Sequence, residues 1–113
     1  MLEKNINEKD LIVAIKKGEH EAFKELYFKY FQMLIRFAWF RVHSVDVAKE
    51  LVQELFIRVW SSRKNLDPEK SIKAYLYKAL GNLVINHLKL KSSNNISLNN
   101  NENFLEPSNN ENI

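Results

Sequence analysis

The amino-acid sequence predicts an all-α protein, a compact four-helix bundle followed by a disordered Asn-rich tail. Apolar residues make up 45% of the 113 residues and recur at the spacing of amphipathic helices. The chain has only two Gly and two Pro, too few for the many turns of an all-β fold. No run of residues is apolar and long enough for membrane insertion. We therefore expect one helical domain over residues 1–91 and a tail or interdomain linker over residues 92–113.

The first helix is expected to begin after Asn7, an N-cap residue with Asp10 in the capping-box position, and to end at Gly18. A second, longer helix is expected from about Glu19 to Val42. Its aromatic residues follow helical spacing, which is more typical of a core than of a cofactor site. The predicted apolar faces comprise Leu11, Ile12 and Ile15, then Phe23, Leu26, Tyr27, Tyr30, Phe31, Leu34, Phe37 and Ala38.

The third helix is expected to run from the cap residue Ser44 to about Ser62, with two different faces. An acidic and polar face beside an apolar one can bind a basic partner while the helix stays folded. The alternative is that the acidic face only keeps the helix soluble. The apolar face comprises Ala48, Leu51, Val52, Leu55, Phe56 and Val59, and the second face comprises Glu50, Gln53, Glu54 and Ile57, at offsets of three, four and seven.

A short basic loop from Arg63 to Lys70 should separate the third helix from a fourth, which is capped by Ser71 and ends near Leu90. Gly81, inside this helix, indicates either close approach by another backbone or a tolerated cost in stability. The predicted buried face comprises Ile72, Leu76, Ala79, Leu80 and Leu83, and Lys78, Asn82, Asn86 and Lys89 follow another line.

Positive charge is concentrated in one part of the chain. The chain as a whole has a net charge of +3. Residues 58–91 hold eight Lys or Arg against two acids, whereas residues 92–113 hold three acids, no base and nine Asn. The basic segment suggests a surface that contacts phosphates, and a solvated helix face is the alternative.

Several classes of function are not expected. There is no Cys, no Gly-rich phosphate loop and no pair of His at metal-ligand spacing, so we predict no metal, no cofactor and no catalytic residues. Glu50 and Glu54 should be solvated and ionised, unlike a catalytic pair. The polar N-terminus lacks the apolar core of a signal peptide, which favours a cytoplasmic protein.

Three segments, residues 21–27, 51–60 and 71–82, resemble in order and spacing region 2 of bacterial RNA polymerase sigma factors of the extracytoplasmic-function type. The resemblance covers about residues 8–91. It implies that the third helix docks on the β′ clamp helices of core RNA polymerase through Glu50, Gln53, Glu54 and Ile57. Family members usually carry an acid where Lys49 stands, so binding should be weakened or altered there.

The resemblance also implies that the loop and fourth helix hold the non-template strand of the −10 promoter element, with one base flipped into a pocket formed partly by the loop. An amide suits an exposed base edge, and Lys or Arg would hold phosphates. Tyr75 stands where the family usually has Trp, although Tyr75 and Tyr77 are alternatively core residues. The implied DNA-binding residues are Arg63, Lys64, Asn65, Lys70, Lys73, Tyr75, Lys78, Asn82, Asn86 and Lys89. Asn86 stands where the family usually has Asp, and Lys89 stands where it usually has Arg.

Complete members of the family carry a second helical domain, region 4, which is not found in these residues. We therefore expect a domain fragment or a truncated product with an anti-sigma factor as a further partner. A truncated module that binds polymerase or an anti-sigma factor without promoter activity is the alternative, and an unrelated helical enzyme is a remote third.

Overall fold

Four α-helices and one short 3₁₀ turn make up residues 7–99, the part of the chain that the computed structural model describes. Within these residues, no helix is long and apolar enough to cross a membrane. The predicted all-α fold is confirmed. The elements are α1 (Glu8–Lys16), α2 (His20–Val42), α3 (Val45–Ser61), η1 (Arg63–Asn65) and α4 (Ile72–Asn99).

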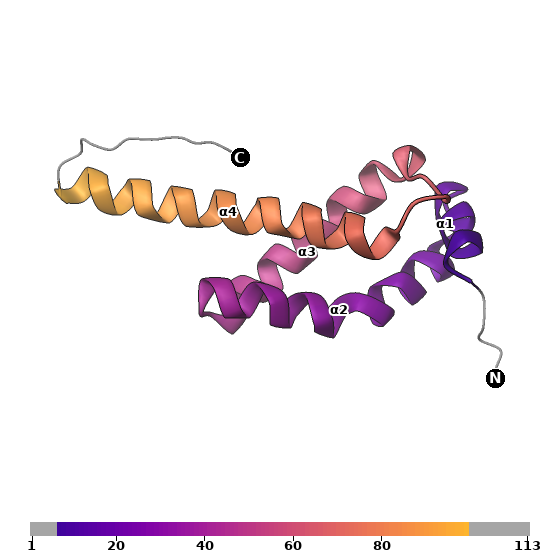
Figure 1. Cartoon of the computed structure of the whole chain (residues 1–113), viewed down its shortest axis with the longest axis horizontal. Helices are drawn as coiled ribbons and strands as arrows, with labels where there is room; N and C mark the ends of the chain where they lie inside the picture. The colour runs from indigo at the N-terminus through magenta and orange to yellow at the C-terminus, as the bar shows by residue number, and fades with distance from the viewer. Residues whose placement is uncertain (1–6, 100–113) are drawn as a thin grey trace.

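The helices pack around α2, which contacts α1, α3 and α4. α2 and α4 run in the same general direction, and α3 crosses behind α4 on its way back (Figure 1). α1 packs across the beginning of α2 and contacts η1, whereas the C-terminal half of α4 extends beyond the other helices (Figure 1). The loop between α3 and α4, residues 62–71, therefore lies at the same end of the molecule as α1.

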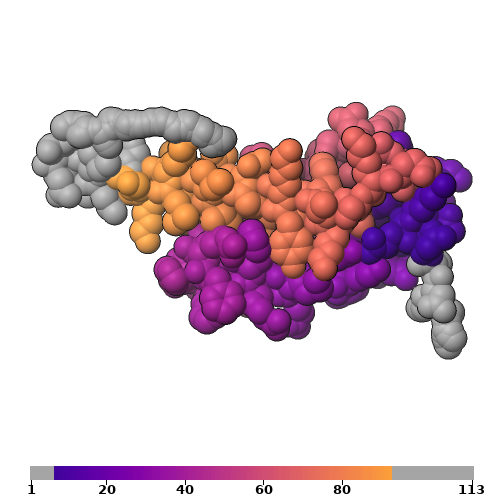
Figure 2. All heavy atoms as spheres, in the orientation of Figure 1, coloured from indigo at the N-terminus to yellow at the C-terminus, as the bar shows by residue number. Residues whose placement is uncertain are grey.

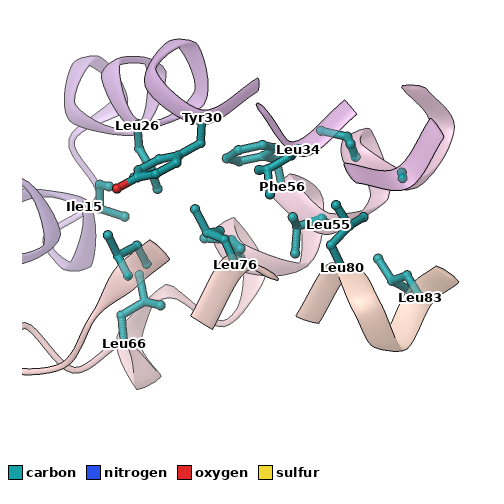
Figure 3. Close-up of a cluster of buried hydrophobic side chains, with 14 of the residues drawn as sticks. Ile15, Leu26, Tyr30, Leu34, Leu55, Phe56, Leu66, Leu76, Leu80 and Leu83 are labelled. Carbon is teal, nitrogen blue, oxygen red and sulfur yellow. The ribbon is translucent and has the colours of Figure 1, made fainter. Parts of the chain in front are cut away.

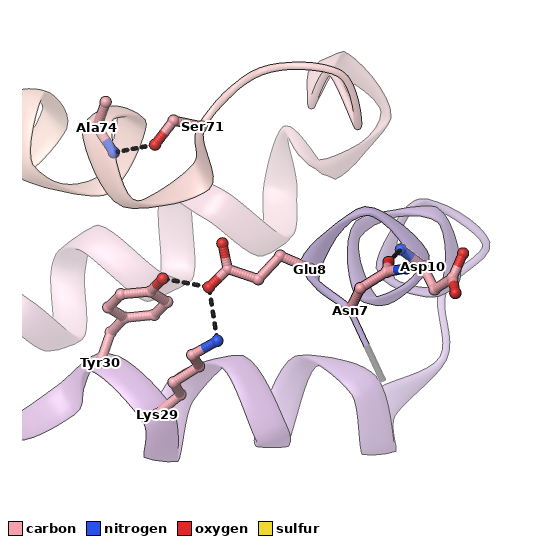
Figure 4. Close-up of polar contacts among 7 residues, drawn as sticks. All are labelled: Asn7, Glu8, Asp10, Lys29, Tyr30, Ser71 and Ala74. Atoms are coloured by element: carbon pink, nitrogen blue, oxygen red, sulfur yellow. Dashed lines mark hydrogen bonds and ion pairs between the residues drawn. The ribbon is translucent and has the colours of Figure 1, made fainter. Parts of the chain in front are cut away.

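Side chains cap three of the helices at the predicted positions. Each cap accepts a hydrogen bond from a backbone N–H in the first turn, which otherwise has no partner within the helix. The three bonds are Asn7 Oδ1 with Asp10 N (2.8 Å), Ser44 Oγ with Val47 N (3.2 Å) and Ser71 Oγ with Ala74 N (3.1 Å), the first and last of which appear in Figure 4.

Two residues with positive φ end the first two helices. Gly18, the predicted stop, has φ +90°, which a residue without Cβ adopts at little cost. His43 has φ 58° and ends α2 by donating its N–H to the Trp39 carbonyl at 2.8 Å. The left-handed region costs an ordinary residue about 1–2 kcal/mol, so the turn into α3 is strained.

The core is formed by one continuous cluster of buried apolar side chains from all four helices and the loop (Figure 3). The predicted apolar faces are confirmed, with the aromatic residues of α2 largely half-buried at the edge of the cluster. No polar side chain is buried among residues 7–92. The buried residues that the periodicity did not single out are Ala22, Val42, Leu66 and Val84.

The predicted end of the fourth helix near Leu90 is wrong, because α4 continues to Asn99. Residues 92–99, expected to be disordered, are helical, and the rest of the predicted tail, residues 100–113, lies outside the described residues. The earlier end was predicted because the sequence after Leu90 no longer shows an apolar helix face. However, no Gly or Pro occurs between Gly81 and Pro107, and a helix that is already formed extends at a small cost per residue.

We expect Gly81→Ala to raise the free energy of unfolding by about 0.5–1 kcal/mol. Gly81 lies inside α4, and a Cβ built there meets nothing within 4 Å, so the added methyl group causes no clash. Of the two interpretations of this residue, the structure favours a tolerated cost. Urea unfolding followed by circular dichroism would measure the change, and a lowered midpoint would contradict the absence of close packing.

Candidate functional site

A hollow of about 530 Å³ lies between the α3–α4 loop and the first turns of α4. We call it the loop hollow. It brings together four of the predicted DNA-binding residues, two from the loop and two from α4. Figure 2 shows this end of the molecule, with the loop and α4 beside α1. Its lining comprises Asn65, Leu66, Asp67, Lys70, Ser71, Ile72, Ala74, Tyr75 and Lys78.

The loop hollow combines an aromatic ring, two cations and an amide over an apolar floor. The Tyr75 side chain is 42% exposed, and Lys70 and Lys78 are exposed as well. Leu66 and Ile72 are buried beneath them. An exposed ring offers a face for stacking, and ammonium groups attract phosphates, so this arrangement suits a nucleotide.

Three of the other predicted residues on α4, Asn82, Asn86 and Lys89, continue this surface along the helix. Lys73 does not, because a residue two positions from Tyr75 lies on the opposite side of an α-helix. Lys73, Asn82, Asn86 and Lys89 are all exposed. Positions 75, 78, 82, 86 and 89 are three or four residues apart, so their Cα atoms follow one line on the helix surface. Lys64, in η1, is exposed too.

Arg63 is placed differently from the rest of the predicted set. It is half-buried, with its guanidinium 4.3 Å from the centre of the Trp60 ring and its Nη1 donating to the Trp60 carbonyl at 3.0 Å. Its Nε is buried without a hydrogen-bond partner. The side chain therefore packs against the end of α3 and is absent from the lining of the loop hollow.

The structure distinguishes Tyr75 from Tyr77, both of which the sequence left as alternatively core residues. Tyr77 is half-buried, and its ring meets that of Phe37 edge-on at 5.1 Å between centroids. It is therefore a residue of the core edge. Tyr75, on the opposite side of the helix, is exposed and free to contact a ligand.

The second predicted face lies along α3, where Glu50, Gln53, Glu54 and Ile57 are all exposed. Ile57 is 66% exposed, which is unusual for a branched apolar side chain. Glu54 accepts a hydrogen bond from Arg58 Nε at 2.8 Å, one turn along the helix. An exposed pair of this kind contributes little to stability, so both side chains remain available to a partner.

An apolar hollow of about 380 Å³ between α2 and α3 borders this acidic face. Periodicity placed Phe23 and Tyr27 in the core, and they are half-buried with one side lining this hollow. Their spacing of four residues on α2 was a signal that they share a surface. The lining comprises Phe23, Tyr27, Gln53, Phe56, Ile57, Trp60 and Ser61, so Gln53 and Ile57 belong to both the acidic face and the apolar hollow.

The family model for sigma-70 region 2 matches residues 26–93, which contain most of α2, all of α3, the loop and much of α4. This chain belongs to the sigma-70 region 2 family. Both hollows and both predicted faces lie within or at the border of the matched residues. The resemblance found in the sequence is thereby confirmed.

Two comparisons with individual proteins agree with this family. The chain is 26% identical over 83 residues to the ECF RNA polymerase sigma factor SigW of Bacillus subtilis (strain 168), covering 74% of this chain and 44% of SigW. The chain thus spans less than half of that relative. Its fold is similar to that of an engineered region 2 of sigmaE solved by NMR in complex with GTAAAA, with a TM-score of 0.74, 22% identity and coverage of 82% of this chain and 97% of the other.

α1 lies before the residues matched by the region 2 family model and is attached to α2 by a polar cluster (Figure 4). Glu8 Oε2 accepts hydrogen bonds from Lys29 Nζ at 2.6 Å and from the Tyr30 hydroxyl. The bond from Lys29, and then that from Tyr30, hold the pKa of the Glu8 carboxyl below its usual value. Burial, and then the bond to Glu8, raise the pKa of Tyr30.

We expect Glu8→Gln to lower the free energy of unfolding at pH 7 by about 1 kcal/mol, a modest loss because the Glu8 side chain is 37% exposed. A carboxyl with a lowered pKa in the folded state stabilises the fold above its unfolded pKa of about 4.3. That contribution is lost as the pH falls through the folded-state pKa. Thermal unfolding at several pH values should therefore show the difference between wild type and Glu8→Gln shrinking in acid, and a constant difference would contradict the charged interaction.

Proposed function

We propose that residues 1–91 act as region 2 of a cytoplasmic sigma factor that binds core RNA polymerase and helps to open promoter DNA. In this proposal the loop hollow and α4 hold the non-template strand of the −10 element, and α3 docks on the β′ clamp helices. The observation that carries the proposal is the meeting of Asn65, Lys70, Tyr75 and Lys78 around one hollow. The fold shared with a region 2 solved with GTAAAA supports it.

The loop hollow has the properties needed to receive a base extruded from the duplex. Extrusion costs a few kcal/mol, which the binding site must return as stacking and hydrogen bonds. Tyr75 supplies a stacking face and Asn65 supplies amide donors and an acceptor. Lys70 and Lys78 are placed to hold the phosphates on either side. No covalent step is involved, so the domain acts by stabilising the open strand.

The α3 face has the properties of a docking surface for a basic helical partner. Glu50 and Glu54 supply negative charge, while Ile57 and the apolar hollow supply surface that gains from removal of water. Charge complementarity mainly directs association, and the apolar contact adds affinity. The β′ clamp helices are the partner we propose for this surface.

Binding of single-stranded DNA tests the promoter role. Fluorescence anisotropy at low salt would compare GTAAAA with oligonucleotides changed one base at a time, using wild type and Asn82→Ala. We expect wild type to discriminate among bases and Asn82→Ala to bind more weakly. Equal affinity for every oligonucleotide, together with no effect of Asn82→Ala, would rule out sequence recognition by this surface.

Retention on core RNA polymerase tests the docking role. The variant Glu50→Lys/Glu54→Lys reverses the charge of the α3 face, and Glu21→Lys on the exposed side of α2 is a control for charge reversal elsewhere. We expect the double variant to be lost from immobilised core enzyme and the control to be retained. Retention of both would remove the α3 face from the proposed interface.

A polymerase-binding or anti-sigma-binding module without promoter activity is the second candidate. It is favoured by the apolar hollow, which lies on α2 and α3 and shares no lining residue with the loop hollow. Binding to core polymerase or an anti-sigma factor, combined with no base discrimination in the DNA experiment, would support this candidate over the first.

A further inference from the structure

The α3–α4 loop is fixed to α1 by polar contacts near its middle and near its end. Lys16 Nζ donates a hydrogen bond to the Leu66 carbonyl at 2.7 Å in a partly buried position. Lys9 Nζ lies 2.9 Å from Glu69 Oε2, with both side chains largely exposed. Both lysines belong to α1, so the helix that precedes the family match holds the loop at two points.

An apolar contact accompanies these polar ones. The Leu66 side chain is 4% exposed and joins the same buried cluster as Leu11, Ile12 and Ile15 of α1. Figure 3 shows Leu66 and Ile15 at the same end of that cluster. Leu66 is therefore held by its side chain in the core and by its carbonyl at Lys16.

The residues fixed in this way are neighbours of those that line the loop hollow. Leu66 lines the hollow itself, and Asn65 and Asp67 on either side of it line it as well. Within the loop, Asp67 Oδ1 accepts the Glu69 N–H at 2.9 Å, and the Asp67 carbonyl accepts the Lys70 N–H at 3.0 Å. Displacement of the Leu66 backbone would therefore shift both Asn65 and the turn that carries Lys70.

We propose that Lys16 is a positioning residue for the loop hollow, and that through the Leu66 carbonyl it sets the affinity of the hollow for an extruded base. This inference rests on the proposed function and adds to it an element that lies outside the matched region. A loop held in its binding geometry loses less conformational entropy when a ligand binds, so affinity rises without any contact between Lys16 and the ligand. The Lys16 ammonium is engaged by a carbonyl, so its role differs from that of a phosphate-binding lysine.

The test separates positioning from charge by comparing two neighbouring lysines. Lys16→Met and Lys17→Met each remove one positive charge from the end of α1, but Lys17 is exposed and only Lys16 bonds the Leu66 carbonyl. The full chain would be titrated with single-stranded GTAAAA and with the same oligonucleotide made abasic at each position in turn. The readout is the dissociation constant of the abasic oligonucleotide divided by that of the intact one, at the position where this ratio is largest. The ratio measures the contribution of the base to binding.

We expect Lys16→Met to reduce this ratio by roughly threefold or more, and Lys17→Met to leave it unchanged while weakening binding of both oligonucleotides equally. Lys16→Arg, which keeps a donor for the Leu66 carbonyl, should restore the ratio. If Lys16→Met lowers the folded fraction in circular dichroism, the titrations are repeated at a lower temperature at which the variant is folded. The same reduction is expected there, and an unchanged ratio would overturn the positioning role.

The outcomes distinguish the inference from the function on which it rests. A wild-type protein that binds intact and abasic oligonucleotides equally would overturn the proposed base pocket and the inference with it. A wild-type protein that discriminates, with the same ratio in folded Lys16→Met as in Lys17→Met, would overturn the positioning role alone.

Discussion

Leu76→Ala is expected to lower the free energy of unfolding by about 2–5 kcal/mol, the largest effect among the substitutions considered. Leu76, on α4, is 0% exposed and lies near the middle of the buried cluster (Figure 3). Truncation removes buried methyl groups and leaves a cavity that the surrounding helices only partly fill. Urea or thermal unfolding followed by circular dichroism would measure the loss.

Leu90→Ala is the matched control on the same helix. Leu90 is 67% exposed, so the same chemical change should alter stability by no more than about 0.5 kcal/mol. Comparable losses for the two variants would mean that the face of α4 that carries Leu76 is not the one packed toward the core.

Tyr75→Ala is expected to weaken binding of single-stranded −10-like DNA by about 1–3 kcal/mol, the usual contribution of a base stacked on an aromatic ring. The exposed ring contributes little to the core, so stability should be nearly unchanged. Tyr75 and Leu76 are adjacent in sequence but lie on different faces of α4. Leu76→Ala should therefore lower stability, whereas Tyr75→Ala should weaken DNA binding. Anisotropy titration at fixed salt, beside an unfolding curve, measures both.

Tyr75→Trp provides the matched control because it keeps an aromatic face and introduces the residue usual in the family. We expect it to bind at least as tightly as wild type. An alanine variant that binds as well as the tryptophan variant would show that the ring does not stack on a base.

Most of the fold was predictable because local signals and apolar periodicity agreed. Asn7, Ser44 and Ser71 were predicted as caps, and each accepts a backbone hydrogen bond in the structure. The end of α4 was not predictable in this way, because helix length there does not depend on burial. Leu66 was also missed, since a single buried residue in a loop has no periodicity to reveal it.

The candidate site was predicted in its composition but not in its arrangement. The resemblance to region 2 selected Asn65, Lys70, Tyr75 and Lys78, and the structure places them around one hollow. Arg63 was chosen for its charge, yet its guanidinium packs on the Trp60 ring. A cation is attracted to the face of an aromatic ring, so a charged side chain can be bound within the protein and not by a ligand. The contacts from α1 depend on tertiary structure and have no local sequence signal.

The length of α4 sets a length scale for the DNA strand that we propose it binds. Eleven residues separate Tyr75 from Asn86, which corresponds to about 16 Å at the helical rise of about 1.5 Å per residue. Stacked nucleotides are about 3.4 Å apart, so a strand bound along this line would place at most about five nucleotides beside it, and fewer where a base is extruded. If α4 binds DNA as proposed, the distance between these two residues limits how many nucleotides can contact the helix at one time.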